Sequence, residues 1–377
     1  MSNPWQLELD RETFLARHWQ KQPLLIRNAI PGFQAPVDAD EIAGLAMEAE
    51  IESRIVEHRD GDWLLHHGPF TEHDFRRDSL WTLLVQAVDH HVPEVARLRQ
   101  LFDFIPQWRF DDIMVSYAVD GGSVGPHYDN YDVFLLQTQG QREWRLGQYC
   151  PPGSELLPHA ELRILADFKQ SESYVLEPGD MLYVPPRLAH WGIARGECTT
   201  WSFGFRAPRA SDMVSLWVDR LLEQAGTDDY FHDANREPAT RPGEISARDL
   251  ERAIAQLQGA LDQYEETRWF GELVTEPRYY PNFDEDNFTE AREELQRGGC
   301  QVMLDEGGRV AWQHINGAVT VFANGDSRDF DDSVLPAVEQ LCATMTLDLP
   351  RQESGTADEA LQAVLGYLLE RGCIYVE

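Results

Sequence analysis

The stretch between about residues 113 and 205 constrains the fold of this chain most. It consists of short runs rich in β-branched and aromatic residues, and Gly and Pro separate these runs at regular intervals. Such runs are typical of β-strands, and their spacing favours antiparallel strands joined by turns. The stretch therefore predicts an antiparallel barrel or sandwich.

The remaining regions predict further domains, because 377 residues exceed the usual size of one hydrophobic core. Residues 14–23 predict a helix that ends at a proline, and residues 24–26 predict a strand. Beyond residue 208 the apolar spacing becomes helical, with Ser246 and Asp249 as a capping-box pattern. One helix face would contain Leu250, Ile254, Leu257, Leu261 and Tyr264. This face fits either packing within the chain or a dimer interface, and the sequence leaves both open.

The C-terminal residues 298–377 combine hairpins with helices. Asn316-Gly317 and Asn324-Gly325 predict turns between strands, and helices are expected at about 333–345 and 357–370. This order is typical of a winged-helix-like domain. The segment contains four arginines, no lysine and thirteen acidic residues, a net charge of −9, which argues against DNA binding.

Acidic residues strongly outnumber basic residues in the whole chain, with a formal net charge of −33. This charge disfavours nucleic acid and favours a basic protein partner, although a source whose proteins are acidic in general would explain it as well. The N-terminus has no apolar signal region, and no stretch approaches the roughly 18 apolar residues that span a bilayer. We therefore expect a cytoplasmic protein with no membrane partner.

Three pairs of the form His-x-Asp or His-x-Glu occur. They are His58 with Asp60, His127 with Asp129, and His159 with Glu161. About two such pairs are expected by chance from 12 histidines and 65 acidic residues, so the spacing alone identifies no site. Two histidines and one carboxylate are nevertheless the facial triad of iron sites, which leaves positions open for a chelating cosubstrate and dioxygen.

His127 has the sequence context that such a site requires. It follows the glycine-rich residues 121–126, which allow close approach of the backbone, and it precedes the apolar strand at 133–136. On a strand, His127 and Asp129 would point to one face and reach one metal. The pairs at His58 and His159 lie in polar or proline-flanked segments, and we expect both to be solvated.

His190 follows a strand, a turn and a second strand. Pro178-Gly179 predict a type II turn, and Pro185-Pro186 end the second strand four residues before His190. We therefore predict that His190 joins His127 and Asp129 at the mouth of the barrel and binds the same metal.

Arg142 is the predicted cation of the site. Gly140 predicts a hairpin, and in the strand that follows Arg142 points to the face opposite Glu143 and Arg145. A buried guanidinium is costly unless a carboxylate pairs with it, which the distal carboxylate of 2-oxoglutarate or a core acid could do. Glu143 and Arg145 predict a surface ion pair.

Together these motifs resemble the JmjC hydroxylases, and among them the bacterial ribosomal oxygenases. The resemblance rests on residues 127–134, 176–180 and 204–208, with further similarity at 14–23 and 44–48. It implies an α+β fold with a double-stranded β-helix, the cupin or JmjC jelly roll. The implied domains are a JmjC/cupin catalytic domain at 1–208 with core strands at about 110–206, a helical dimerisation region at 209–297, and a winged-helix-like C-terminal domain at 298–377.

The resemblance also implies the chemistry. The implied Fe(II) ligands are His127, Asp129 and His190. Arg142 would bind 2-oxoglutarate, dioxygen would be the other cosubstrate, and Ser116 and Ser202 are weaker candidates for hydrogen bonds to 2-oxoglutarate that fit equally well as ordinary strand residues. The bacterial branch hydroxylates the β-carbon of an arginine in large-subunit (50S) ribosomal protein 16. We therefore expect a homodimeric 2-oxoglutarate-dependent dioxygenase with a basic ribosomal protein substrate.

Two alternatives stay open. A related JmjC hydroxylase would use the same site on a histidine, asparagine or lysine. A non-catalytic metal-binding cupin would keep the metal ligands, but Arg142 together with all three ligands argues for catalysis.

Overall fold

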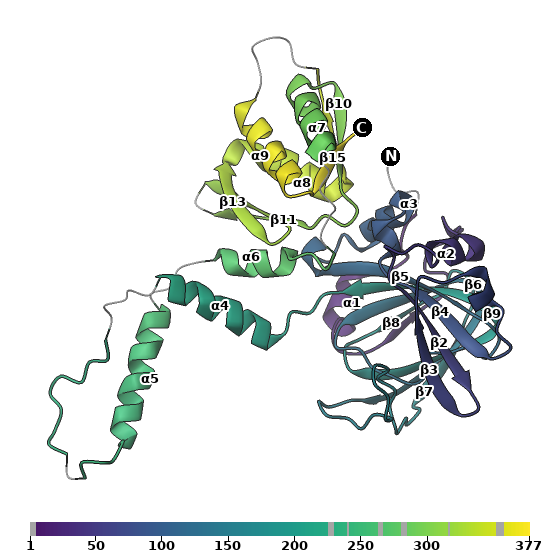
Figure 1. Ribbon diagram of the computed structural model, residues 1–377, viewed down its shortest axis with the longest axis horizontal. Coiled ribbons are helices and arrows are strands. Elements are labelled where there is room, and N and C mark those ends of the chain that lie inside the picture. The colour runs from purple at the N-terminus through teal and green to yellow at the C-terminus, as the bar shows by residue number, and fades with distance from the viewer. Residues whose placement is uncertain are drawn as a thin grey trace.

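The structure of the chain is a computed structural model that describes residues 5–224, 230–239, 241–262, 267–279, 285–315, 317–351 and 358–377. Figure 1 shows a strand-rich body, helices that extend away from it, and a C-terminal unit of helices and small sheets. This order confirms the predicted α+β fold class. None of the described helices is long and apolar enough to cross a membrane.

The strand-rich body is an antiparallel barrel. Nine strands of the described chain form its sheet in the order β1-β8-β6-β9-β5-β4-β2-β3, with β7 paired to β6. The strands are β1 (Leu24–Ile26), β2 (Ser53–Arg59), β3 (Asp62–His67), β4 (Leu80–Val85), β5 (Phe110–Ala118), β6 (Asp132–Tyr149), β7 (Glu172–Leu176), β8 (Met181–Val184) and β9 (Leu188–Phe205). β6 pairs with β8 through residues 133–136 and with β7 through residues 142–146, while β9 pairs with both halves of β6.

The long strands β6 and β9 pair along their length, with register shifts around Gln137 and Gln139. Gly140 lies in this irregular part of β6 with φ of 63°, and a Cβ there would come within 2.1 Å of the Glu197 carbonyl oxygen. The predicted hairpin at Gly140 is therefore wrong, because the residue bends one continuous strand. A left-handed glycine serves a bulge as well as a turn, so the sequence signal of the two is the same.

Alternate residues of β6 face the barrel interior and the outer layer. Val133 and Leu135 pack inside with Leu182 of β8, whereas Phe134 packs outside against Phe14 with ring centroids 5.3 Å apart. The helices of the outer layer are α1 (Arg11–Arg17), α2 (Ala39–Leu45) and α3 (Pro93–Ala96). Short 3₁₀ helices lie at Glu72–Phe75, Val88–His90, Arg97–Phe102, Gln107–Arg109 and Asp332–Val334. The predicted first helix is present but ends at Arg17, before the proline.

The helical region contains α4 (Ala210–Gln224), α5 (Ala247–Asp262), α6 (Arg268–Thr275) and α7 (Glu285–Arg297). In Figure 1, α4 and α5 extend away from the body. Ser246 and Asp249 form the predicted capping box, with the Ser246 N–H donating to the Asp249 carboxylate at 3.0 Å. Tyr264, the last member of the predicted apolar face, lies outside the described residues.

The C-terminal unit has its own core of buried apolar side chains, among them Val302, Val321, Leu341 and Leu368. Its strands are β10 (Cys300–Leu304), β11 (Val310–Ile315), β12 (Ala318–Ala323), β13 (Asp326–Asp331), β14 (Thr346–Leu349) and β15 (Ile374–Val376), and its helices are α8 (Leu335–Thr344) and α9 (Glu359–Glu370). The strands form the sheets β14-β10-β15 and β11-β12-β13. Asn324-Gly325 forms the predicted turn, and Asn316 lies outside the described residues.

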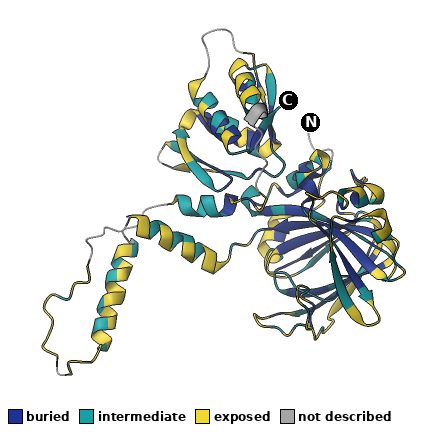
Figure 2. Ribbon diagram, in the orientation of Figure 1, coloured by how far each residue is buried: buried dark blue, intermediate teal, exposed yellow. Residues whose placement is uncertain are grey.

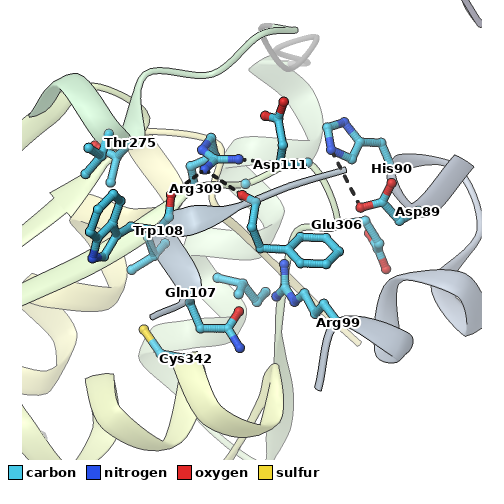
Figure 3. Close-up of a pocket in the computed structure, with 16 residues that line it drawn as sticks. Asp89, His90, Arg99, Gln107, Trp108, Asp111, Thr275, Glu306, Arg309 and Cys342 are labelled. Carbon is cyan, nitrogen blue, oxygen red and sulfur yellow. Dashed lines mark hydrogen bonds and ion pairs between the residues drawn. The ribbon is translucent and has the colours of Figure 1, made fainter. Parts of the chain in front are cut away.

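Arg309 joins the C-terminal unit to the barrel. Its guanidinium donates hydrogen bonds to the carbonyl oxygens of Trp108 at 3.2 Å and Phe110 at 2.9 Å (Figure 3). Burial lowers the pKa of Arg309 to about 9, so the side chain stays charged at neutral pH. None of the predicted site residues lines the pocket around these contacts.

Replacing Arg309 with methionine is expected to lower the free energy of unfolding by about 2–3 kcal/mol, because two carbonyl oxygens at the junction lose a charged donor. Arg371→Met is the matched control, since the Arg371 side chain forms a partly exposed ion pair of 3.7 Å with Asp326 and should contribute little. Chemical denaturation followed by tryptophan fluorescence measures both. If Arg309→Met is as stable as the wild type, other contacts hold the two units together.

Candidate functional site

Three side chains that could ligate a metal meet beside the start of β9. His127 and His190 pair through their backbones in an isolated antiparallel bridge, and their rings lie 4.3 Å apart. Asp129 Oδ2 lies 4.0 Å from His127 Nε2 and 3.6 Å from His190 Nε2. The possible ligand atoms of the three side chains all lie within 4.8 Å of one another, and no other group of three or more His, Cys, Asp or Glu side chains in the described residues does this. Two imidazoles and one carboxylate at these distances fit a facial iron triad.

The backbone around these ligands differs from the expected strand. His127 forms a single β-bridge, and Asp129 lies in an irregular segment. The backbone carbonyl of Asp129 accepts a hydrogen bond of 2.6 Å from the backbone N–H of Arg187. The close approach predicted for the preceding glycines is present, since a Cβ on Gly122 would lie 2.3 Å from the Trp81 carbonyl oxygen. An extended backbone is enough to point His127 and Asp129 the same way.

Both imidazoles present Nε2 to the site. His127 Nδ1 donates to the Gly125 carbonyl at 2.9 Å, and His190 Nδ1 donates to the Leu188 carbonyl at 3.0 Å. Because a carbonyl oxygen only accepts, these bonds place the ring proton on Nδ1 and leave the Nε2 lone pair for a metal. Burial, with the neighbouring His127 second, lowers the pKa of His190 to about 4, so its Nε2 carries no proton at neutral pH.

The turn before β8 has the predicted geometry. Gly179 has φ of 92°, and the Asp180 N–H donates to the Glu177 carbonyl at 2.9 Å. The Asp180 carboxylate accepts from the backbone N–H groups of Glu177 and Asn28, both at 3.0 Å, and pairs with Arg27. The turn therefore fixes β8 against the segment after β1, and His190 follows as the third residue of β9.

Arg142 lies inside the barrel with 5% of its surface exposed. Nη1 donates a long hydrogen bond of 3.4 Å to Ser116 Oγ, and the guanidinium lies 5.7 Å from the centroid of the Trp144 ring. Nε and Nη2 are buried and have no acceptor among the described residues. A buried guanidinium without an acceptor is costly, so these free N–H groups fit the carboxylate of a bound dicarboxylic acid. The alternative, a core acid paired with Arg142, is not present in the described part of the chain.

The predicted ion pair on the opposite face of β6 is confirmed. Glu143 accepts from Arg145 at 2.9 Å and from Arg195 at 2.8 Å. These bonds lower the pKa of Glu143 to about 2. Arg145 therefore has its own partner, unlike Arg142.

Ser116 and Ser202 both lie on the barrel interior. Ser116 is opposite Thr200, and Ser202 is opposite Leu135, one of the interior residues of β6. The Ser116 hydroxyl donates to the Thr200 carbonyl at 3.2 Å and accepts from Arg142. Ser116 thus contacts the cation directly, and the role of both serines towards a ligand stays a prediction.

Two interior polar residues were missed by the sequence reasoning. Gln137 and Thr200 are almost fully buried, and Thr200 Oγ1 donates to Gln137 Oε1 at 2.9 Å. The sequence pattern of β6 already indicated Gln137, because every second residue of this strand from Val133 to Gln137 points into the barrel. A polar residue at an inward position marks a site or a hydrogen-bonded pair.

The other His-x-acid pairs do not bring a histidine and a carboxylate together at the site. His58 is a half-buried residue of β2, so the expectation of a solvated pair is wrong for this histidine. Asp60 is exposed in the turn between β2 and β3, with φ of 56°. His159 Nδ1 accepts from the backbone N–H groups of Glu161 at 3.1 Å and Leu162 at 2.8 Å, so it stabilises its own loop.

Comparisons with known families identify two regions. A JmjC domain matches residues 97–213, and a ROXA-like winged helix matches residues 262–375. The predicted JmjC/cupin domain and winged-helix-like C-terminal domain are thereby confirmed, while the exact boundaries at 208 and 297 stay predictions.

Known relatives match all or part of the chain. The ribosomal protein uL16 3-hydroxylase of Escherichia coli strain K12 is 34% identical over 99% of both chains, and a probable ribosomal oxygenase of Haemophilus influenzae is 43% identical over 54% of this chain and 51% of its own. Among solved structures, the Escherichia coli ribosomal oxygenase YcfD in complex with cobalt and 2-oxoglutarate has a TM-score of 0.82 at 33% identity and covers 99% of both chains. The chain therefore belongs to the JmjC-domain ribosomal oxygenase family.

Proposed function

We propose that this chain is an Fe(II)- and 2-oxoglutarate-dependent protein hydroxylase that acts on the β-carbon of an arginine in ribosomal protein uL16. The observation that carries the proposal is the buried guanidinium of Arg142, whose free N–H groups lie on the same barrel interior as the metal ligands. A metal site alone needs no such cation, whereas a dicarboxylate cosubstrate does. The name of the Escherichia coli relative, a uL16 3-hydroxylase, supports the substrate and the carbon atom.

Each site residue has a distinct part in this proposal. His127, Asp129 and His190 would hold Fe(II), and their set of two imidazoles and one carboxylate is the one that oxygenases with 2-oxoglutarate and dioxygen as cosubstrates use. Bound iron supplies dioxygen activation coupled to the oxidative decarboxylation of 2-oxoglutarate to succinate. Arg142 pairs with the distal carboxylate and so orients the cosubstrate. Its neighbour Ser116 and the more distant Ser202 would offer their hydroxyl groups to the same molecule, for which Ser116 would turn its single O–H away from the Thr200 carbonyl.

The charge of the chain supports a basic protein substrate. With 65 acidic and 32 basic side chains, long-range attraction favours a cationic ribosomal protein over nucleic acid. The C-terminal unit is itself acidic, with a net charge of −9 over residues 298–377, so it is not expected to bind DNA. A hydroxylase of ribosomal proteins acts where these proteins are made, which places the enzyme in the cytoplasm.

Mass spectrometry of ribosomal proteins from the source strain, with and without this gene, tests the proposed target. We expect uL16 from the intact strain to be heavier by one oxygen atom, fragmentation to locate this atom on an arginine, and NMR of the isolated peptide to assign it to the β-carbon. An oxygen on a histidine, asparagine or lysine of another protein would replace the target but keep the enzyme class. Identical masses throughout would contradict the hydroxylase assignment and favour a non-catalytic cupin.

The enzyme is a homodimer in this proposal, and α5 contributes to the interface. Leu250, Ile254 and Leu257 share one face of α5 and are 59%, 45% and 58% exposed. Figure 2 shows α5 mostly exposed at a distance from both cores. Burial of such a face stabilises the helix, and a second copy of the chain supplies an equally apolar surface.

Replacing Ile254 and Leu257 together with aspartate is expected to convert the dimer to a monomer, because burying two carboxylates at an apolar interface is highly unfavourable. Ala255→Asp is the matched control, since Ala255 lies on the opposite face of α5. Sedimentation velocity at micromolar concentration measures both variants. A monomeric wild type, or a dimeric double variant, would contradict the proposed interface.

A further inference from the structure

One buried hydroxyl group connects the two segments that present the histidine ligands. Ser123 is 6% exposed, and its Oγ accepts hydrogen bonds from the backbone N–H of Gly125 at 3.0 Å and from the indole Nε1 of Trp191 at 2.8 Å. Gly125 is the residue whose carbonyl accepts from His127 Nδ1, and Trp191 directly follows His190. The contacts of Ser123 therefore reach both rings through one intermediate residue each.

Between two points of backbone pairing with β9, the loop that precedes His127 is held by the Ser123 side chain and by the Leu165 N–H, which donates to the Pro126 carbonyl at 2.8 Å. Gly122 pairs with Ala194 of β9, with the Ala194 N–H donating at 3.0 Å, and pairing resumes only at the bridge of His127 with His190. Between these points Gly125 adopts φ of 81°, and Pro126 has no N–H to donate. The Ser123 hydroxyl supplies the missing connection from this loop to β9.

Trp191 is a suitable partner because its ring has two further contacts that limit its movement. It contacts Phe168 edge to face at a centroid distance of 5.9 Å, and the Arg145 guanidinium lies 5.2 Å from its centroid. A fixed indole holds the Ser123 oxygen, which holds Gly125, whose carbonyl sets the orientation of the His127 ring. The direction of the His127 Nε2 lone pair thus depends on a chain of three hydrogen bonds.

We propose that Ser123 is a positioning residue for the metal site, which sets its affinity for a divalent metal by fixing the His127 loop against β9. The inference rests on the proposed metal-binding function of His127, Asp129 and His190. Ser123 does not itself contact the metal or the cosubstrate. Partners that orient a metal-ligating histidine typically change metal affinity by about 10–100-fold when they are removed.

Titration of the metal-free full-length protein with cobalt(II) alone tests this role, with affinity and the visible absorption of the bound ion as readouts. Ser123→Ala removes the acceptor of two N–H groups and should weaken cobalt(II) binding about 10–100-fold. Trp191→Phe removes one donor, keeps an aromatic ring and should weaken binding less. In the Ser123→Ala background it should add little, because both changes act through one hydroxyl.

Ser53→Ala is the matched control. Ser53 is a serine of β2 that is 4% exposed, and its hydroxyl donates to the Ala46 carbonyl at 3.2 Å, so cobalt(II) affinity should not change. Ser123→Ala and Trp191→Phe affinities within about twofold of the wild type would overturn the inference. If Ser123→Ala fails to fold, the Trp191→Phe result decides in the same way. If the wild-type protein binds no cobalt(II), the proposed metal site is overturned as well. If the wild type binds cobalt(II) and both variants bind it equally well, only the role of Ser123 is overturned.

Discussion

The rate of 2-oxoglutarate turnover is expected to fall by more than about 100-fold in the His127→Ala variant. His127 Nε2 is one of the three proposed ligand atoms, and its removal would leave iron with two protein ligands. Loss of a group that merely orients a ligand costs about 10–100-fold, so loss of the ligand itself costs more. Succinate formation at saturating Fe(II) and 2-oxoglutarate measures the effect.

The matched control is His58→Ala, because His58 opens another His-x-Asp pair in the same chain. His58 contacts Trp63 on β3 with ring centroids 4.5 Å apart and lies on β2, so we expect near-normal turnover. If His127→Ala retained the wild-type rate of succinate formation, His127 would not be an iron ligand.

Arg142→Met is expected to raise the Michaelis constant for 2-oxoglutarate by about 30- to 4,000-fold, which corresponds to about 2–5 kcal/mol. The variant leaves the distal carboxylate of the cosubstrate in the barrel interior without its charged partner. Affinity for cobalt(II) alone should change little, because Arg142 is not one of the clustered ligands. Initial rates over a range of 2-oxoglutarate concentrations, with a metal titration beside them, separate the two effects.

Arg195→Met provides the matched comparison on the neighbouring strand β9. Arg195 pairs with Glu143 at 2.8 Å and is half exposed, so its loss should leave the Michaelis constant for 2-oxoglutarate unchanged. Equal constants for the wild type and Arg142→Met would move the cosubstrate site to another part of the barrel.

Much of the barrel and its site could be predicted because the information is local. The alternation of β6 turns Arg142 to one face of the strand and Glu143 and Arg145 to the other. The Pro178-Gly179 turn marks the start of β8, which leads into β9 and His190. Period-two patterning and turn chemistry depend on neighbouring residues, so a single sequence contains them.

Other features could not be predicted because they depend on long-range pairing. Gly140 has the sequence signal of a hairpin, but Glu197, far along the chain, lies against it and makes it a bend in one strand. His127 reaches the metal site through a bridge to His190 rather than through a strand of its own. Which backbone pairs with which is decided by packing of the whole barrel.

The same limit applies to contacts between distant segments. The hydrogen bonds of Arg309 to Trp108 and Phe110 join the C-terminal unit to the barrel, and no local pattern marks them. Ser123 is likewise an ordinary small residue in the sequence until Trp191 is placed beside it. The polar pair of Gln137 and Thr200 was accessible in principle, because strand alternation already turns Gln137 inward.

In the proposed reaction, one oxygen atom passes from dioxygen to a ribosomal protein. Incubation of purified enzyme with Fe(II), 2-oxoglutarate and recombinant uL16 under ¹⁸O₂, followed by mass spectrometry of uL16, tests this transfer. We expect one ¹⁸O atom on an arginine of uL16 and an equal amount of succinate, both lost in the His127→Ala variant. Unlabelled uL16 in the presence of active, 2-oxoglutarate-consuming enzyme would contradict the proposed substrate, and no consumption of 2-oxoglutarate at all would contradict the proposed reaction.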